Sequence, residues 1–329
     1  ETYDIGLDLG LFNNRIFASF DYYTKTNSDL LLNVPVPRAS GFGAAITNIG
    51  EVENKGWELE LTTRNLQGKF DWTTDFNLSH NENVVKKLGP DNSPIYGGAF
   101  DIQHNVLMVG EPMYTLFLVQ REGILSQEDI DNGAALLGNQ TAGDHKYVDF
   151  DENGSIGPED RQLSGDPNPD YLWSVNNTFR YKGFDLSVLV QGQTGGLIYS
   201  TFGRAINRTS MGFVENTVGR QRDRWRSAED PGAGVEGKVN GSFGRIKNTD
   251  WLYSSDYWRV RNITLGYDLG ARLGDKVFKG VRIYVTAENW FGGDKYTGGF
   301  NPEAVNNSGD DYGGFPLSRS IITGLNFTF

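Results

Sequence analysis

From residue 149 onward, side chains that carry oxygen atoms recur at alternate positions. Their types and their spacing are those of a metal-binding loop. Counted as a twelve-residue calcium loop, they supply ligands at positions 1, 3, 5, 7 and 12. The predicted ligands are Asp149, Asp151, Asn153, Ser155 (through its main-chain carbonyl) and Asp160. Position 12 is an aspartate rather than a bidentate glutamate, so we expect a weaker or less fully coordinated site.

The alternative for this segment is a turn rich in Asp, Asn and Gly, which forms without a metal. Calcium is favoured because two further positions also fit the loop. Gly154 stands at position 6, where the sharp turn is needed, and Ile156 at position 8 can anchor the loop on a small core. The expected role of the ion is structural, because it would fix the long connection 83–170.

No set of residues resembles a catalytic centre. The three histidines are scattered, cysteine is absent, and neither a G-x-S-x-G elbow nor a G-x-x-x-x-G-K-[ST] phosphate loop occurs. Paired acids such as Asp310 with Asp311 could be imagined as glycosidase carboxylates. A solvated loop or a polar wall explains such pairs better, so we expect a protein that is not an enzyme.

Two segments, 245–258 and 292–318, are rich in aromatic side chains. Aromatic rings suit the apolar faces of sugars and of peptide side chains, so these segments form the expected substrate-facing surface. Its members are Trp251, Tyr253, Tyr257, Trp258, Tyr296, Phe300, Tyr312 and Phe315. For each residue taken alone, packing within a loop or a place in an interfacial aromatic girdle is the better interpretation.

These residues lie in or beside the connections between nine segments whose side chains alternate between apolar and polar. The segments are 3–12, 15–26, 55–66, 69–82, 171–182, 184–193, 256–268, 280–291 and 319–329. Tight turns alternate with long connections, which are 27–54, 83–170, 194–255 and 292–318. A transmembrane β-barrel is built in this way, with short periplasmic turns and long extracellular loops. The sequence therefore predicts an all-β, antiparallel transmembrane barrel.

Alternation alone does not exclude a soluble sandwich, which also buries one face of each sheet. Three features favour the barrel. The segments have the length of a tilted strand that crosses a bilayer, the polar faces often carry charge, and the connections follow the expected order of short and long. One segment is irregular, because Trp258 and Val260 are out of phase with the apolar residues after Asn262. We predict a β-bulge near Arg261 and Asn262.

Bulk composition narrows the possible classes. The hydrophobic fraction of 38% and the mean hydropathy of −0.46 suit a barrel, whose strands expose only every second residue to lipid. The net charge of −12 argues against nucleic acid as a partner. The number of strands is odd, whereas single-chain bacterial barrels have an even number, and residue 1 is already next to a strand. We expect residues 1–329 to be the C-terminal part of a longer barrel.

Several motifs, in order along the whole chain, resemble those of the SusC/RagA-like TonB-dependent receptors of Bacteroidetes outer membranes. They are Ser40-Gly-Phe-Gly, Asn48-Ile-Gly-Glu-Val-Glu-Asn-Lys-Gly-Trp-Glu-Leu-Glu-Leu, Gly165-Asp-Pro-Asn-Pro-Asp-Tyr, Phe184-Asp-Leu-Ser with Gln191-Gly, Asp256-Tyr-Trp-Arg-Val-Arg-Asn-Ile-Thr-Leu-Gly-Tyr and Thr286-Ala-Glu-Asn-Trp. The resemblance implies a plugged barrel of 22 strands in the outer membrane, to which this chain contributes the C-terminal strands. The plug, the segment that contacts TonB and the earlier strands would lie outside it.

The resemblance also implies a function. Such receptors import oligosaccharides or peptides, usually with a SusD-like surface lipoprotein as a lid, and they depend on the TonB complex. Similar Asp- and Asn-rich loops occur in these receptors where this chain has its predicted calcium loop. The sequence does not separate a glycan cargo from a peptide cargo.

Other functions remain open at this point. Within transport, the alternative is a siderophore or cobalamin receptor. Outside it are a non-transporting barrel for adhesion or secretion, and a soluble glycan-binding module. Alternate arginines around Trp225 could contact lipopolysaccharide phosphates or the lid protein, although a solvated loop helix is the better interpretation. Lipopolysaccharide and other outer-membrane lipids are further expected partners.

Overall fold

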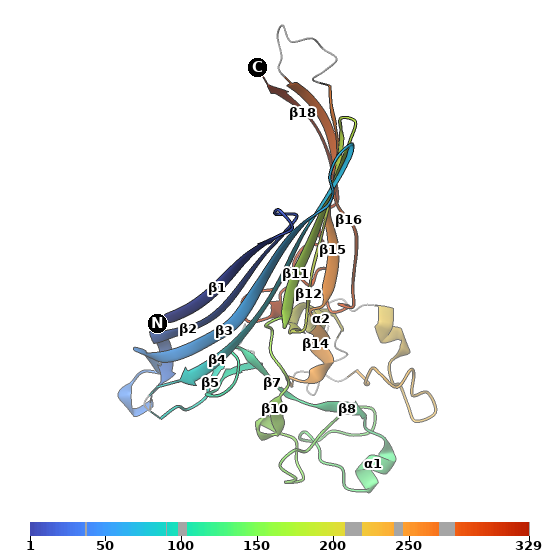
Figure 1. Cartoon of the computed structure of the whole chain (residues 1–329). Coiled ribbons are helices and arrows are strands. Elements are labelled where there is room, and N and C mark those ends of the chain that lie inside the picture. The colour runs from blue at the N-terminus through green and yellow to red at the C-terminus, as the bar shows by residue number, and fades with distance from the viewer. Residues whose placement is uncertain are drawn as a thin grey trace.

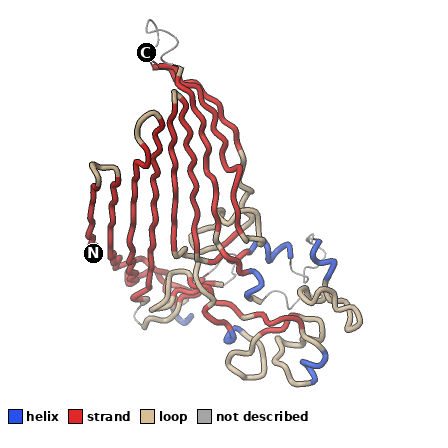
Figure 2. The backbone as a smooth tube through the Cα atoms, turned by 45° about the vertical axis from the view of Figure 1, so that its right-hand side comes forward, coloured by secondary structure: helices blue, strands red, loops and turns tan. Residues whose placement is uncertain are grey.

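The computed structural model of the chain describes residues 1–36, 38–89, 91–97, 104–207, 219–239, 246–269 and 280–328. Within these residues the main element is a nine-stranded sheet of order β1-β2-β3-β4-β11-β12-β15-β16-β18 (Figures 1 and 2). Its strands are β1 (Thr2–Leu11), β2 (Ile16–Pro35), β3 (Ala44–Leu66), β4 (Phe70–Lys87), β11 (Tyr171–Tyr181), β12 (Phe184–Thr194), β15 (Tyr257–Asp268), β16 (Gly280–Asp294) and β18 (Ser320–Thr328). All neighbours pair antiparallel, which confirms the predicted strands and their order.

The two faces of this sheet differ in the way that the alternation predicts. The register puts Leu7 and Phe20 on one face, and the same face carries Leu265, Ile283 and Leu325 farther along the sheet. All five side chains are exposed. A soluble sandwich would cover such a face with a second sheet. An exposed apolar face of this extent is what a lipid-facing barrel wall requires.

Aromatic side chains mark both ends of the apolar face. At the end next to the long connections, the ring centroids of Trp57 and Tyr171 are 6.2 Å apart, and those of His80 and Tyr171 are 5.2 Å apart. At the end next to the short turns, Phe184 and Tyr267 are 4.4 Å apart. Rings of this kind settle at the two interfaces of a bilayer. They therefore bound the lipid-facing band.

The predicted bulge is confirmed. Against β12, Val260 pairs with Val190 and Asn262 pairs with Leu189, so Arg261 is the extra residue of β15 on that side. Against β16 the register shifts at the same place, where Asn289 and Trp290 of β16 lie opposite Arg261. This shift restores the phase: Trp258 and Val260 lie on the apolar face before the bulge, and the residues from Ile263 onward rejoin that face after it.

The predicted limits of the connection 27–54 were wrong. β2 continues to Pro35 and β3 begins at Ala44, and only a short link with the 3-10 helix η1 (Arg38–Ser40) lies between them. The polar residues around Asp29 interrupt the alternation, and the sequence pattern therefore ended there. Irregular pairing between Asn27 and Leu31 accommodates them, and the two strands then resume their ladder. β4 likewise continues to Lys87, beyond the predicted boundary at 82.

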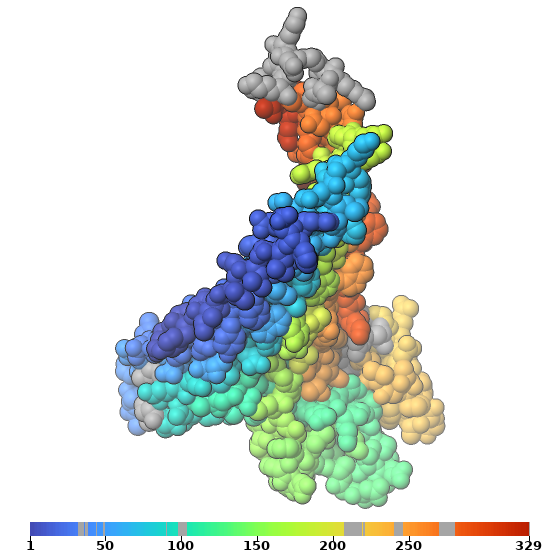
Figure 3. Space-filling view, in the orientation of Figure 1, coloured from blue at the N-terminus to red at the C-terminus, as the bar shows by residue number. Residues whose placement is uncertain are grey.

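The other three long connections contain small elements of their own. The connection 83–170 contains β5 (Ile95–Gly97), β6 (Asn105–Leu107), β7 (Thr115–Val119), β8 (Arg121–Ile124), α1 (Gln127–Asp131), β9 (His145–Tyr147), η2 (Pro158–Asp160) and β10 (Arg161–Leu163). The later connections contain β13 (Leu197–Ser200), α2 (Thr201–Asn207), η3 (Gly219–Asp223), η5 (Thr249–Trp251), β14 (Leu252–Ser254) and β17 (Asp310–Asp311). Most of them gather at one end of the large sheet (Figure 3).

These connections share a core. Leu116 and Leu118 pack against Tyr199 and Trp251, and all four side chains are almost completely buried. Strands from two further connections pair in the small sheet β14-β13-β17. The connections therefore form one packed body, which we call the loop body. No helix in the described ranges is long and apolar enough to cross a membrane.

Candidate functional site

The predicted calcium loop brings three carboxylates together. Oxygens of Asp149, Asp151 and Asp160 lie within 4.8 Å of one another. Gly154, at position 6, has a φ of +83°, which a residue with a side chain rarely adopts. Three negative charges at this spacing repel one another unless a cation lies between them, and carboxylate oxygens are the ligands that calcium prefers. The donor set fits the ion.

Backbone groups hold two of these carboxylates in place. Asp149 accepts hydrogen bonds from the N–H groups of Asn153, at 3.2 Å, and of Gly154, at 2.8 Å. Asp160 is fully buried and accepts from the N–H groups of Phe150 and Gly157, each at 2.7 Å. The other two predicted ligands contact each other, because Oδ1 of Asn153 accepts from the N–H and the hydroxyl of Ser155.

The loop is anchored as its sequence suggests. Ile156 is 4% exposed and packs with Val119 and Tyr147 in a small core. Its N–H donates to the carbonyl of Leu136 at 3.0 Å. Burial raises the pKa of the Tyr147 hydroxyl above its ordinary value, and the nearby carboxylate of Asp250 raises it further. The predicted calcium loop is therefore part of the loop body and not a free turn.

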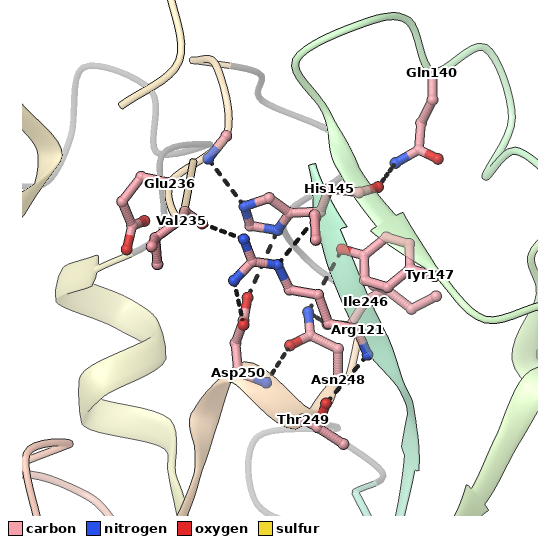
Figure 4. Close-up of polar contacts among 12 residues, drawn as sticks. Arg121, Gln140, His145, Tyr147, Val235, Glu236, Ile246, Asn248, Thr249 and Asp250 are labelled. Atoms are coloured by element: carbon pink, nitrogen blue, oxygen red, sulfur yellow. Dashed lines mark hydrogen bonds and ion pairs between the residues drawn. The ribbon is translucent and has the colours of Figure 1, made fainter. Parts of the chain in front are cut away.

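A set of polar contacts beside this core, which we call the clasp, joins the connections 83–170 and 194–255 (Figure 4). Arg121 contacts the carboxylate of Asp250 and the carbonyl of Val235. The N–H of Gly237 donates to Nε2 of His145 at 3.3 Å. These groups are largely buried, and a buried ion pair tolerates little displacement. The clasp therefore fixes one connection on the other.

A second buried contact joins the connections 83–170 and 292–318. Nε2 of His104 contacts Oδ1 of Asp310, and both side chains are completely buried. The imidazole stacks on the ring of Tyr199, with 4.3 Å between centroids and 11° between planes. β17, which contains Asp310, pairs in parallel with β13, which contains Tyr199. Nothing local in the sequence indicates this contact, because its members come from three distant segments.

Three of the aromatic residues predicted for the substrate surface lie inside the loop body. Trp251 is 1% exposed in the shared core. Tyr296 is 6% exposed, and its hydroxyl contacts the carboxylate of Asp311. Burial and this hydrogen bond raise the pKa of Tyr296 above its ordinary value. Tyr253 packs edge-on against Tyr296 at 5.4 Å. For these three residues the structure favours the packing alternative.

The two predicted residues on β15 lie on opposite faces of the sheet. Trp258 lies on the apolar face, 45% exposed, where an aromatic girdle is the better interpretation. Tyr257 lies on the polar face, where its ring is 5.7 Å from the guanidinium of Arg259 and 6.0 Å from that of Arg261. Tyr257 also lines a cavity of about 360 Å³ on this face, together with Glu58, Glu60, Asn77, Ser174 and Gln191.

The remaining three predicted residues are exposed on the loop body. Phe300 is 59% exposed, Tyr312 is 39% exposed and Phe315 is 90% exposed. The sequence did not indicate Phe202, whose ring lies 5.4 Å from that of Phe300. Phe202 belongs to α2, away from the aromatic-rich segments, so only the fold brings it to this group. We call these four residues, of which Phe202 is half-buried, the exposed aromatic surface.

Comparison with known proteins yields a family model and several relatives. Residues 1–99 match the model described as TonB dependent receptor-like, beta-barrel. The chain is 33% identical to TonB-dependent receptor P3 of Formosa agariphila over 99% of the chain and 34% of the relative. It is 28% identical to TonB-dependent receptor SusC of Bacteroides thetaiotaomicron over 100% of the chain and 32% of the relative. The chain thus spans about a third of the length of these curated relatives.

Solved structures agree with the fold. The structure of the RagAB peptide transporter superposes on the whole chain with a TM-score of 0.82, at 22% sequence identity, and the match covers 35% of the transporter chain. The 'closed-closed' state of the RagAB peptide importer gives a TM-score of 0.81. At this level of identity the likeness concerns the barrel architecture.

Proposed function

The chain belongs to the family of SusC/RagA-like TonB-dependent receptors, and from this premise we propose that its receptor imports oligosaccharides or peptides. Members of this family are outer-membrane β-barrel transporters and not enzymes. Uptake would require the TonB complex and a SusD-like lipoprotein that covers the loop body. Residues 1–329 would supply the C-terminal strands, the short link between β2 and β3, and the loops 83–170, 194–255 and 292–318. The plug and the earlier strands would come from the rest of the receptor.

One observation supports import most directly. The polar face of the sheet meets the loop body at the ends of β12 and β16, and the residues of the exposed aromatic surface belong to the connections that leave those two ends. Tyr257 and the cavity beside it lie on this polar face. A cargo held by the loops would meet hydrogen-bonding side chains as it entered the lumen, and aromatic rings with nearby acids suit both sugars and peptides.

We propose that substrate contacts come from Tyr257, Phe300, Tyr312 and Phe315, to which the fold adds Phe202. Trp251, Tyr253 and Tyr296 would support this surface from within the loop body, and Trp258 would belong to the girdle. The division follows exposure, because a side chain that is already buried gains little from contact with a ligand.

We also propose that a calcium ion binds the loop formed by Asp149, Asp151, Asn153, Ser155 and Asp160. The support is the convergence of three carboxylates, the left-handed glycine and the buried anchor at Ile156. The ion would relieve the repulsion among the carboxylates. It would also hold Asp149, two residues after the end of β9, in a fixed place. Its role would be structural.

The test is native mass spectrometry of the receptor extracted from its own outer membrane, followed by uptake into cells. The probes are a fluorescently labelled tryptic digest of serum albumin and a labelled partial hydrolysate of plant cell-wall polysaccharide. We expect a SusD-like lipoprotein in the complex and TonB-dependent uptake of one mixture. A complex without the lipoprotein that imports a ferric siderophore or cobalamin would support those rival cargoes. A barrel that imports nothing would support adhesion or secretion.

A further inference from the structure

We infer that His104 and Asp310 are positioning residues for substrate capture, because they hold the turn that carries Tyr312 and Phe315 in a fixed place. The inference rests on the proposed function for what this turn binds. It rests on the geometry of the loop body for how the turn is held.

Within the described part of the 292–318 connection, the contact between His104 and Asp310 is the only ion pair whose two side chains are both completely buried. Both side chains are completely buried, and Nε2 of His104 contacts Oδ1 of Asp310. A buried carboxylate is unfavourable unless a donor or a cation faces it, and His104 is such a group. Displacement of either partner therefore removes a contact between two completely buried groups, although Oδ2 of Asp310 also accepts a hydrogen bond from the hydroxyl of Ser308 at 3.0 Å.

His104 is itself fixed by two other segments. Its carbonyl accepts a hydrogen bond from the N–H of Phe117 at 2.9 Å, and its ring stacks on Tyr199. Phe117 lies in β7 and Tyr199 lies in β13, and both strands border the shared core. The imidazole is therefore a rigid point to which the connection 292–318 is attached.

Asp311 carries this attachment from Asp310 to the turn. Its side chain is 1% exposed, and Oδ1 accepts from the N–H of Gly313 at 2.7 Å and of Gly314 at 3.1 Å. The φ of Gly313 is +87°, a conformation that few side chains allow. Because Asp310 and Asp311 are adjacent, the buried pair and the turn cannot move independently.

The held turn presents apolar rings to solvent. Phe315 is 90% exposed, so fixing this ring in place buries little apolar area in return, and Tyr312 remains 39% exposed. Order without burial is expected where a surface must be ready for a ligand, because a pre-formed surface does not have to be ordered on binding. An ordered turn that leaves its ring exposed points to a role in capture and not in folding alone.

The experiment uses the full receptor with its lid, purified from the outer membrane, and compares His104→Gln, Asp310→Asn and the double variant. Tyr296→Phe, which removes only the hydroxyl that contacts Asp311, is a milder perturbation of the same turn. Asp250→Asn is the matched control, because it breaks a buried ion pair of the clasp and not the link to β17. Heat-modifiable gel migration verifies that each variant folds as a barrel.

The first measurement is hydrogen exchange of peptides from 309–316 and from 225–239. We expect exchange at 309–316 to be at least about tenfold faster in both single variants, because one partner is left buried without its counterpart. The double variant should recover much of the protection, since two amides can hydrogen-bond to each other. Asp250→Asn should accelerate exchange at 225–239 and leave 309–316 unchanged.

The second measurement is the concentration dependence of uptake of the labelled mixture. Looser positioning weakens capture, so the half-saturating concentration should rise about tenfold with an unchanged maximal rate. Unchanged exchange at 309–316 in His104→Gln would overturn the inference, and so would faster exchange with unchanged half-saturation. If wild-type receptor imports neither mixture, the proposed function fails, and the role in capture fails with it. The exchange data would still decide separately whether the pair holds the turn.

Discussion

Asp160 combines a role in the fold with a place in the proposed calcium site. Its two oxygens each accept a backbone N–H, and the same carboxylate faces Asp149 and Asp151. Asp151 is different, because it is exposed and contacts only its neighbour Asn153 among the hydrogen bonds described for it. Replacement of Asp151 should therefore disturb metal binding more than it disturbs the loop.

We predict that Asp151→Asn weakens calcium binding by at least about tenfold, because affinity in such loops follows the number of charged ligands. Isothermal titration of the purified receptor with calcium measures the change. Asp131→Asn, which alters an exposed acid of α1 outside the loop, should leave the affinity unchanged. The calcium proposal fails if the wild-type receptor binds no calcium or if the two variants behave alike.

Asp129 gives a prediction about pH. Hydrogen bonds from the Ser126 hydroxyl and N–H, together with Lys146, hold the pKa of its carboxyl well below the usual range. A lowered folded-state pKa stabilises α1 above the unfolded-state pKa of about 4, and the gain is lost as the pH falls through the folded-state value. The difference between wild type and Asp129→Asn should thus be constant from pH 7 to pH 5 and shrink in stronger acid.

Hydrogen-exchange protection factors of peptides from 124–132, at pH 7, 5 and 3, measure this difference. Protection factors correct for the intrinsic pH dependence of exchange. A gap between the two proteins that widens toward pH 3 would contradict the assignment of Asp129 as a carboxylate that stabilises the first turn of α1.

The sequence predicted the site in part, for reasons visible at single residues. The calcium-loop acids lie within one short segment, so spacing alone brought them together. Exposure is a tertiary property, however, and Trp251 looks like Phe315 in sequence although one is buried and the other is 90% exposed. The contact between His104 and Asp310 joins distant segments and has no local signal.

At the level of elements, the strands were predictable because lipid on one side and a polar lumen on the other impose a strict period of two. Their extracellular ends were not. Beyond the bilayer nothing requires alternation, and β2 and β3 continue to pair through the irregular region near Asp29. The bulge at Arg261 was predictable because it interrupts the alternation of apolar and polar side chains inside the membrane. There, the apolar side chains that follow it must return to the lipid-facing side of the sheet.

We predict that deletion of Arg261 prevents assembly of the barrel. Without the extra residue, a one-residue slip would turn Ile263 and Leu265 toward the lumen and their polar neighbours toward lipid. Heat-modifiable migration of the receptor in outer-membrane fractions reports assembly. Deletion of Gly234, an exposed turn residue of the loop body, is the matched control and should assemble normally.

At the level of the molecule, the structure combines a lipid-facing sheet with a loop body that has its own core. The sheet is stabilised by its ladders and by the bilayer, whereas the loop body depends on a few buried side chains such as Trp251. The two parts should therefore differ in their response to the same kind of substitution.

We predict that Trp251→Ala destabilises the loop body by about 3–5 kcal/mol and leaves the barrel assembled. Limited proteolysis of outer-membrane vesicles should then cleave within 104–163 and 249–254, while heat-modifiable migration persists. Phe315→Ala removes a ring that is 90% exposed and should leave proteolysis unchanged. Equal resistance of the Trp251 variant and the wild type would refute the shared core as the source of loop stability.

The shared core has a consequence for how such receptors can diversify. Leu116 comes from the connection 83–170, whereas Tyr199 and Trp251 come from the connection 194–255, yet they fill one interior together. A chimera that receives a single connection from a relative would inherit one side of an interface whose other side does not match it. Grafting all the connections as a set keeps the mutual fit, so new cargo preferences should be transferable between relatives only as whole extracellular modules.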